Sequence, residues 1–202
     1  MKLNLPNKIT LARIVLSIFI MIILLIPWYD FGYRFPIYVL NGETLSLKYI
    51  IAGILFLIAS LTDFVDGHIA RSRNMVTDFG KMADAIADKI LVNGLLIILA
   101  YFRIISIVIP VVIVTRDIIV DSCKMICGNK GKVVAASFLG KAKTMTMMIG
   151  LTLTLFGNFP FVYLNLPLNN ILLLIATVLS VVSGCQYYYN AKPYLFTSNE
   201  KK

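Results

Sequence analysis

The sequence predicts an all-α integral membrane protein with six transmembrane helices and both termini in the cytoplasm. Of the 202 residues, 59% are hydrophobic and 14% are charged, whereas a soluble domain is about half apolar and about a quarter charged. The apolar residues fall into runs close to the ~20 residues that cross a bilayer. Most basic residues fall between these runs, as the positive-inside rule predicts.

The apolar runs place six helices in a single membrane-embedded domain that covers residues 1–202. The expected helix ranges are 8–27, 47–72, 79–101, 104–126, 138–157 and 168–190. Residues 28–46 are expected to form a polar and aromatic loop. Residues 127–133 are expected to form a basic loop that contains two glycines.

The charge distribution predicts the orientation of these helices. An even number of crossings puts both termini on one side of the membrane. That side would carry most of the lysines and arginines, whereas the opposite side would carry Arg34, Lys48 and Arg103 alone. Because connections rich in Lys and Arg stay in the cytoplasm, both termini are expected there.

The formal net charge of +9 does not indicate a nucleic-acid-binding protein. The basic residues are not gathered into one patch with interleaved aromatic residues. The three cysteines form no zinc-binding pattern with His68, the single histidine of the chain. The aspartates are therefore the residues that point to a chemistry.

Four aspartates lie on the second and third expected helices, close to the connection between them. Asp63 and Asp66 are three residues apart, and Asp84 and Asp88 are four apart, so that each pair shares one helix face. A short connection makes these helices antiparallel neighbours, and their aspartate faces can meet near the cytoplasmic boundary. Like charges at such a place repel one another and lose hydration.

Two interpretations of the aspartates are open. In the first, they are solvated at helix ends or paired with nearby cations, namely Arg71, Lys81 and Lys89. In the second, which we favour, divalent cations offset the repulsion. All-oxygen ligands favour Mg²⁺ or Mn²⁺ over Zn²⁺. Because Mg²⁺ keeps open positions for substrate phosphates and Arg71 can bind phosphate oxygens with two N–H groups, the pattern indicates metal-dependent phosphate chemistry.

Residues 63–88 resemble the signature of a known family. The pattern Asp63-x-x-Asp66-Gly67-x-x-Ala70-Arg71 is followed, after eight residues, by Gly80-x-x-x-Asp84-x-x-x-Asp88. It resembles the signature of the CDP-alcohol phosphotransferases, and the six-helix layout extends the resemblance over nearly the whole chain. This resemblance implies an enzyme that displaces CMP from a CDP-linked donor.

The resemblance implies a role for each residue of the signature. Asp63, Asp66 and Asp84 would bind the metal ions. Asp88 would lie at the same site as a ligand and would act as general base on the acceptor hydroxyl. The CDP pocket would be formed by Asp63, Gly67, Ala70, Arg71 and Gly80. The resemblance also implies a homodimer surrounded by lipids of the bacterial plasma membrane. The distribution of lysines and arginines puts the active site on the cytoplasmic side.

Two further stretches narrow the resemblance within this family. The segment "LPNKITLARI" near the N-terminus and the segment "LGKAKTM" from Leu139 to Met145 are similar to bacterial phosphatidylglycerophosphate synthases, as is the chain length. This likeness implies transfer of the phosphatidyl group from CDP-diacylglycerol to sn-glycerol 3-phosphate.

An anionic acceptor requires cations near Asp88, and the sequence offers Arg116, Lys141 and Lys143. Arg116 lies inside the fourth apolar run, where an unpaired arginine is costly. A pair with Asp117 is not expected, because adjacent residues do not face each other on a helix. The alternative for the two lysines is cytoplasmic charge that contacts anionic lipids.

Two alternative functions stay open at this point. The same signature would serve an enzyme with another acceptor, such as serine, inositol phosphate or phosphatidylglycerol. A small cation transporter would instead use intramembrane acids as a permeation path. Transport predicts carboxylates throughout the membrane depth, whereas the four aspartates cluster near one connection.

Overall fold

The structure is a computed structural model that describes residues 5–72, 77–131 and 138–195, without the side chains of residues 5–6, 64–72, 78, 81 and 195. The described residues are mostly helical, as predicted. Their six α-helices are α1 (Leu5–Leu25), α2 (Leu47–Ser72), α3 (Asp78–Tyr101), α4 (Val108–Asn129), α5 (Phe138–Leu155) and α6 (Leu168–Leu195). Two short 3₁₀ helices cover Trp28–Phe31 and Phe161–Leu164, and two strands cover Ile37–Leu40 (β1) and Glu43–Ser46 (β2).

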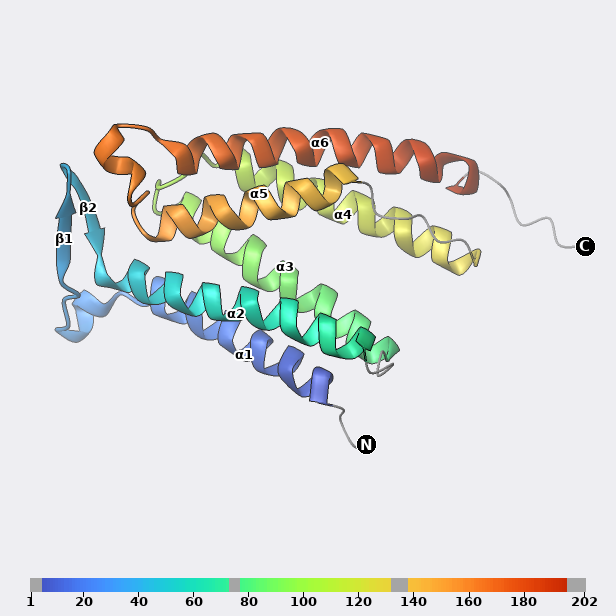
Figure 1. Cartoon of the computed structure of the whole chain (residues 1–202), viewed down its shortest axis with the longest axis horizontal. Coiled ribbons are helices and arrows are strands. Elements are labelled where there is room, and N and C mark those ends of the chain that lie inside the picture. Colours follow the sequence, from blue (N-terminus) through green and yellow to red (C-terminus); the bar gives the residue numbers. More distant parts are fainter. Residues whose placement is uncertain (1–4, 73–76, 132–137, 196–202) are drawn as a thin grey trace, which may run out of the picture.

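The helices form two groups of three (Figure 1). In the first group α1 packs against α2 and α3, and in the second α6 packs against α4 and α5. Contacts between α2 and α5 and between α3 and α4 join the groups. The end of α2 and the start of α3 lie away from the β-hairpin, as do the start of α1 and the end of α6. The two helices that carry the aspartate signature therefore meet at the end of the molecule opposite the hairpin.

An apolar core joins the two groups. All six helices contribute large side chains that are fully buried, including Ile20, Leu24, Phe56, Leu91, Leu95, Leu96, Leu99, Ile113, Leu151, Leu155 and Leu173. Gly53 allows α2 to approach Phe156 closely, since a Cβ at residue 53 would lie 2.9 Å from the Phe156 ring. This packing fixes the position of α2 relative to the second group of helices.

The segment 28–46, expected to be a loop, contains a β-hairpin. β1 and β2 are antiparallel, with Ile37 opposite Ser46. The two residues between the strands, Asn41 and Gly42, have φ angles of 48° and 88°, as a two-residue hairpin turn requires. The Asn-Gly dipeptide is the sequence signal for this hairpin.

Helix α4 begins at Val108, later than the expected residue 104. Arg103 has a φ of 59°, which lies outside helical geometry and separates α3 from α4. Pro110 falls in the first turn of α4, where a missing N–H is tolerated. At the other end α4 reaches Asn129, and α6 continues to Leu195 rather than ending near 190.

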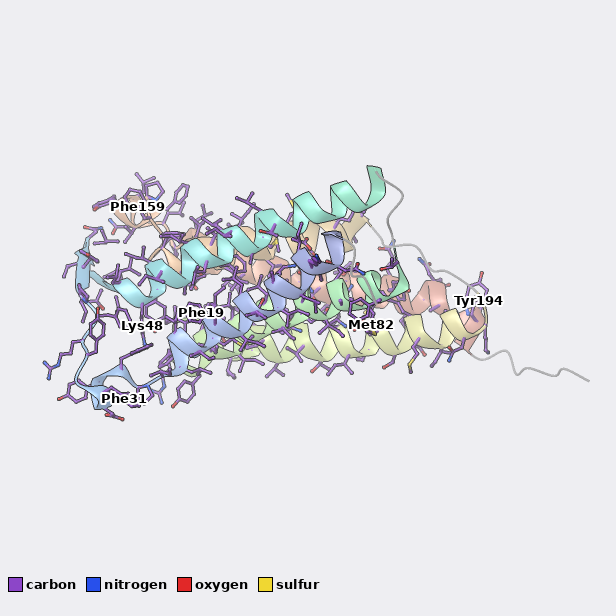
Figure 2. All side chains as sticks on the ribbon, turned by 90° about the horizontal axis from the view of Figure 1, so that it is seen from below. Phe19, Phe31, Lys48, Met82, Phe159 and Tyr194 are labelled. Atoms are coloured by element: carbon purple, nitrogen blue, oxygen red, sulfur yellow. The ribbon has the colours of Figure 1, made fainter. Side chains whose placement is uncertain are left out.

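Apolar side chains cover much of the outer surface. Within the described ranges, Asn7–Leu25 and Leu168–Tyr194 are the two stretches long and apolar enough to cross a membrane. The other four helices also expose large apolar side chains, for example Leu61, Ile97, Ile118 and Ile149. Figure 2 shows Phe31 and Phe159 at the hairpin end and Met82 and Tyr194 toward the opposite end.

Candidate active site

Arg13 of α1 joins the two halves of the aspartate signature. Its Nη1 forms an ion pair with Oδ1 of Asp63 on α2, and its Nη2 donates to Oδ1 of Asp84 on α3. Arg13 is 2% exposed, whereas both carboxylates remain partly open to solvent. The structure thus brings Asp63 and Asp84 together, with a buried cation from a third helix between them.

Asp88 lies one turn beyond Asp84 on α3 and is half-buried. It lines a cavity of about 590 Å³ whose other walls come from α4, α5 and α6. The Asp88 carboxylate lies within electrostatic range of both Lys143 and Arg13. Asp88 therefore connects the Asp63–Asp84 pair to this cavity.

The cavity carries an excess of positive charge. Five cationic side chains line it, namely Lys89, Arg116, Lys124, Lys141 and Lys143. Three acidic side chains also line it, namely Asp88, Asp117 and Asp121. The remaining lining is small or apolar and includes Gly140, Thr144 and Tyr187. The formal net charge of these lining side chains is +2, which suits an anionic ligand.

Asp117 holds two of the cations expected from the sequence. Lys143 Nζ on α5 lies 3.1 Å from Oδ1 and 3.4 Å from Oδ2 of Asp117, and Arg116 Nη1 lies 3.1 Å from Oδ1. The expectation that Arg116 does not pair with Asp117 is therefore wrong. The long side chain reaches the neighbouring carboxylate with Nη1 while α6 binds the other two nitrogens of its guanidinium.

Helix α6 fixes the guanidinium of Arg116. Its Nη2 donates to Ser183 Oγ at 2.9 Å, and its Nε donates to the Ser180 carbonyl at 3.1 Å. Gly184 makes room for the side chain, since a Cβ there would lie 2.9 Å from Arg116 Cγ. Arg116 is consequently held from two helices at the cavity wall.

A second, more exposed group of charges lies one turn further along α4. Asp121 pairs with Lys89 of α3. Lys124 Nζ lies 3.6 Å from Oδ1 of Asp121. Lys141 is exposed and lines the same cavity. Of the three cations expected to bind the acceptor, the structure brings Arg116 and Lys143 together and places Lys141 on the wall.

The remaining signature residues of α2 are described by backbone alone. The helix continues through Ser72, but the side chains of Asp66, Ala70 and Arg71 lie outside the described residues, as does that of His68. Among the side chains that the structure describes, no three acidic, His or Cys groups converge closely enough to hold a metal ion. Asp63 and Asp84 nevertheless supply only oxygen donors and gather around a positive charge. Their chemistry fits a hard divalent cation.

Gly80 lies where α1 meets the start of α3. Thr77 caps α3 by accepting from the Gly80 N–H at 3.0 Å, and Asn7 Nδ2 donates to Thr77 Oγ1 at 3.1 Å. A Cβ at residue 80 would lie 2.6 Å from Asn7 Oδ1. The missing side chain of Gly80 therefore allows Asn7 to link the two helices.

Gly80→Ala is expected to lower stability because the added methyl group overlaps Asn7. Overpacking of this kind costs about 1–3 kcal/mol. Thermal unfolding of the purified variant in detergent checks this, with Gly128→Ala as control, since a Cβ at Gly128 meets nothing within 4 Å. An unfolding temperature equal to that of the wild type would contradict the close contact.

Sequence reasoning did not identify Arg13 or Asn7 as site residues, and it considered Asp117 only as a partner of Arg116, which it rejected. Arg13 lies in the first apolar run, where an unpaired arginine is as costly as at Arg116. That cost is a usable signal, because it requires an acidic partner on another helix. Nothing in the sequence distinguishes Asn7 from polar residues that cap helices, whereas Asp117 lies inside the fourth apolar run, where the same cost applies to an acidic residue.

Comparison with known proteins assigns the chain to a family. A family model described as CDP-alcohol phosphatidyltransferase matches residues 3–182. The chain belongs to the CDP-alcohol phosphatidyltransferase family. Members of this family are membrane-associated enzymes that generally use divalent metal ions. The resemblance of residues 63–88 to the family signature is thereby confirmed at the level of the family.

Several curated family members are similar over nearly their whole length. A Bacillus subtilis protein named CDP-diacylglycerol–glycerol-3-phosphate 3-phosphatidyltransferase is 42% identical over 97% of this chain and 99% of its own. Proteins of the same name from Rickettsia bellii and Wigglesworthia glossinidia brevipalpis are 34% and 30% identical. The match to the Rickettsia protein covers 95% of this chain and 97% of the relative. The match to the Wigglesworthia protein covers 97% of this chain and 99% of the relative.

Proposed function

We propose that this enzyme transfers the phosphatidyl group from CDP-diacylglycerol to sn-glycerol 3-phosphate and releases CMP. The names of its relatives describe this reaction. The observation that carries the proposal is the cavity beside Asp88, whose wall has a net positive charge. A phosphate monoester carries about −1.5 to −2 near neutral pH, so its charge matches that of the wall.

Arg116 and Lys143 are the groups that bind the phosphate of the acceptor. Both are held at fixed positions by Asp117, and Arg116 is held by α6 as well. Fixed cations lose little conformational entropy when an anion binds. Lys141 adds an exposed positive charge at the wall. Serine has no net charge and would leave the cations of the cavity unmatched, so it fits less well than a phosphate.

We assign the metal ions, Mg²⁺ or Mn²⁺, to Asp63, Asp66, Asp84 and Asp88. Bound there, they would supply positive charge to the donor diphosphate and to the leaving phosphate. The CDP pocket is assigned, from the family signature, to Asp63, Gly67, Ala70, Arg71 and Gly80. Arg71 would bind diphosphate oxygens through its N–H groups.

Asp88 is assigned as the general base. A hydroxyl of glycerol 3-phosphate gives its proton to the Asp88 carboxylate, and its oxygen forms a bond to the phosphatidyl phosphorus. The bond between that phosphorus and the CMP oxygen breaks, and CMP leaves with the electron pair. Binding donor and acceptor in line contributes much of the rate enhancement.

We propose that all six helices span the plasma membrane, with both termini in the cytoplasm and residues 1–202 forming one domain. Exposed apolar side chains on every helix support this, because large apolar surfaces on a monomer mark a membrane or protein contact. We further propose a homodimer within the membrane. Cysteine labelling of the connection at 73–76, from either side of sealed vesicles, tests the orientation.

The acceptor is tested by supplying purified protein with CDP-diacylglycerol and a panel of acceptors, with Mg²⁺ or Mn²⁺ present. CMP release is expected only with glycerol 3-phosphate. Serine, inositol phosphate and phosphatidylglycerol serve as matched alternatives that differ in charge and size. Turnover with one of these, and none with glycerol 3-phosphate, would exclude the proposed acceptor while leaving the family assignment intact.

A further inference from the structure

Arg13 is buried at the centre of the site, although it lies outside the signature of residues 63–88. It lies inside the first apolar run, on α1, and its side chain reaches Asp63 and Asp84. A buried arginine is stable only where acidic groups pair with it. The two carboxylates that pair with Arg13 come from different helices, and both are assigned above to the metal.

The guanidinium group suits this arrangement better than any other cation. It presents nitrogens in a rigid planar fork, whereas lysine offers one nitrogen on a flexible chain. Arg13 uses Nη1 for Oδ1 of Asp63 and Nη2 for Oδ1 of Asp84. One side chain therefore fixes the spacing and rotation of two carboxylates that the chain separates by a helix connection.

The backbone of α1 is itself fixed near this point. The hydroxyl of Ser17 donates to the carbonyl of Arg13 at 2.7 Å, and Ser17 is fully buried. The contact between Asn7 and Thr77 ties the start of α1 to the start of α3. The Arg13 guanidinium is thus supported by a rigid helix rather than by a loop.

We infer that Arg13 is a positioning residue of the metal site. It pairs with Oδ1 of Asp63 and with Oδ1 of Asp84, and it would thereby fix the orientation in which both carboxylates hold the divalent cation. Groups that orient metal-binding carboxylates typically change metal affinity by about 10–100-fold when removed. The inference rests on the proposed metal site, but it does not depend on the identity of the acceptor.

The test is a Mn²⁺ titration of the full-length protein in lipid nanodiscs without substrates, with free Mn²⁺ measured by electron paramagnetic resonance. Arg13→Gln is expected to raise the Kd for Mn²⁺ by about 10–100-fold. Arg13→Lys keeps the charge but offers one nitrogen, so a smaller rise is expected. Arg34→Gln, at the exposed hairpin end, is the control and is expected to match the wild type.

Each outcome of this titration decides the inference. A Kd for Arg13→Gln equal to or lower than that of the wild type would overturn it, and a lower value would mean that Arg13 competes with the metal. If circular dichroism shows that Arg13→Gln does not fold, Arg13→Lys decides, and an unchanged Kd overturns the inference. Failure of the wild type to bind Mn²⁺ would instead overturn the proposed metal site itself.

Discussion

Asp88→Asn is expected to abolish turnover while leaving metal-dependent binding of CDP-diacylglycerol largely intact. The amide has nearly the same shape as the carboxylate but cannot accept the acceptor proton. Loss of a general base typically lowers the rate by about 10²–10⁴-fold. The variant keeps Asp63 and Asp84, which Arg13 holds independently of residue 88. Donor binding should therefore survive.

The measurement pairs CMP release with binding of CDP-diacylglycerol to the same preparation. Asp30→Asn is a suitable control, since Asp30 is exposed in the 3₁₀ helix at the hairpin end. Near-normal turnover by Asp88→Asn would exclude Asp88 as the base. Loss of both turnover and donor binding would assign Asp88 chiefly to the metal.

Lys143→Met is expected to raise the KM for glycerol 3-phosphate and to leave donor binding unchanged. Lys143 is 5% exposed and lies between Asp117 and the cavity. In the complex, Lys143 would form a buried charge pair with the acceptor phosphate, and removing one partner of such a pair costs about 2–5 kcal/mol of binding. The lower end of that range corresponds to roughly a 30-fold loss in kcat/KM.

The matched control for this variant is Lys192→Met. Lys192 is exposed in the last turn of α6. Like Lys143, it would add one positive charge to the cytoplasmic side of the membrane, but it does not line the cavity. If both variants lower activity equally, the lysines act through membrane orientation or lipid contact. If Lys143→Met alone raises KM, the phosphate-binding role stands.

The sequence predicts the helices and the aspartate faces because these depend on local periodicity. Spacing of three and four residues puts Asp63 with Asp66 and Asp84 with Asp88 whatever the rest of the chain does. The cation that joins the two faces could not be assigned in this way. Arg13 and Asp84 are 71 residues apart, and their contact depends on how α1 packs against α2 and α3.

Tertiary contacts also explain the error at Arg116. Helical periodicity gives only the direction in which each side chain leaves the helix, and residues 116 and 117 leave it in different directions. It takes no account of the length of the arginine side chain. In the structure Ser180 and Ser183 of α6 bind the guanidinium and hold it where Nη1 reaches Asp117. The pairing is therefore set by a helix that lies far away in the sequence.

The proposed transfer of the phosphatidyl group to glycerol 3-phosphate is tested most directly by identifying the lipid that the purified protein makes. The protein is incubated with CDP-diacylglycerol, glycerol 3-phosphate and Mn²⁺ or Mg²⁺, and lipids and nucleotides are measured by mass spectrometry. We expect phosphatidylglycerophosphate and CMP in equal amounts, with neither formed after chelation of the metal. Phosphatidic acid in place of phosphatidylglycerophosphate, or product formation that is unaffected by chelation, would contradict this account.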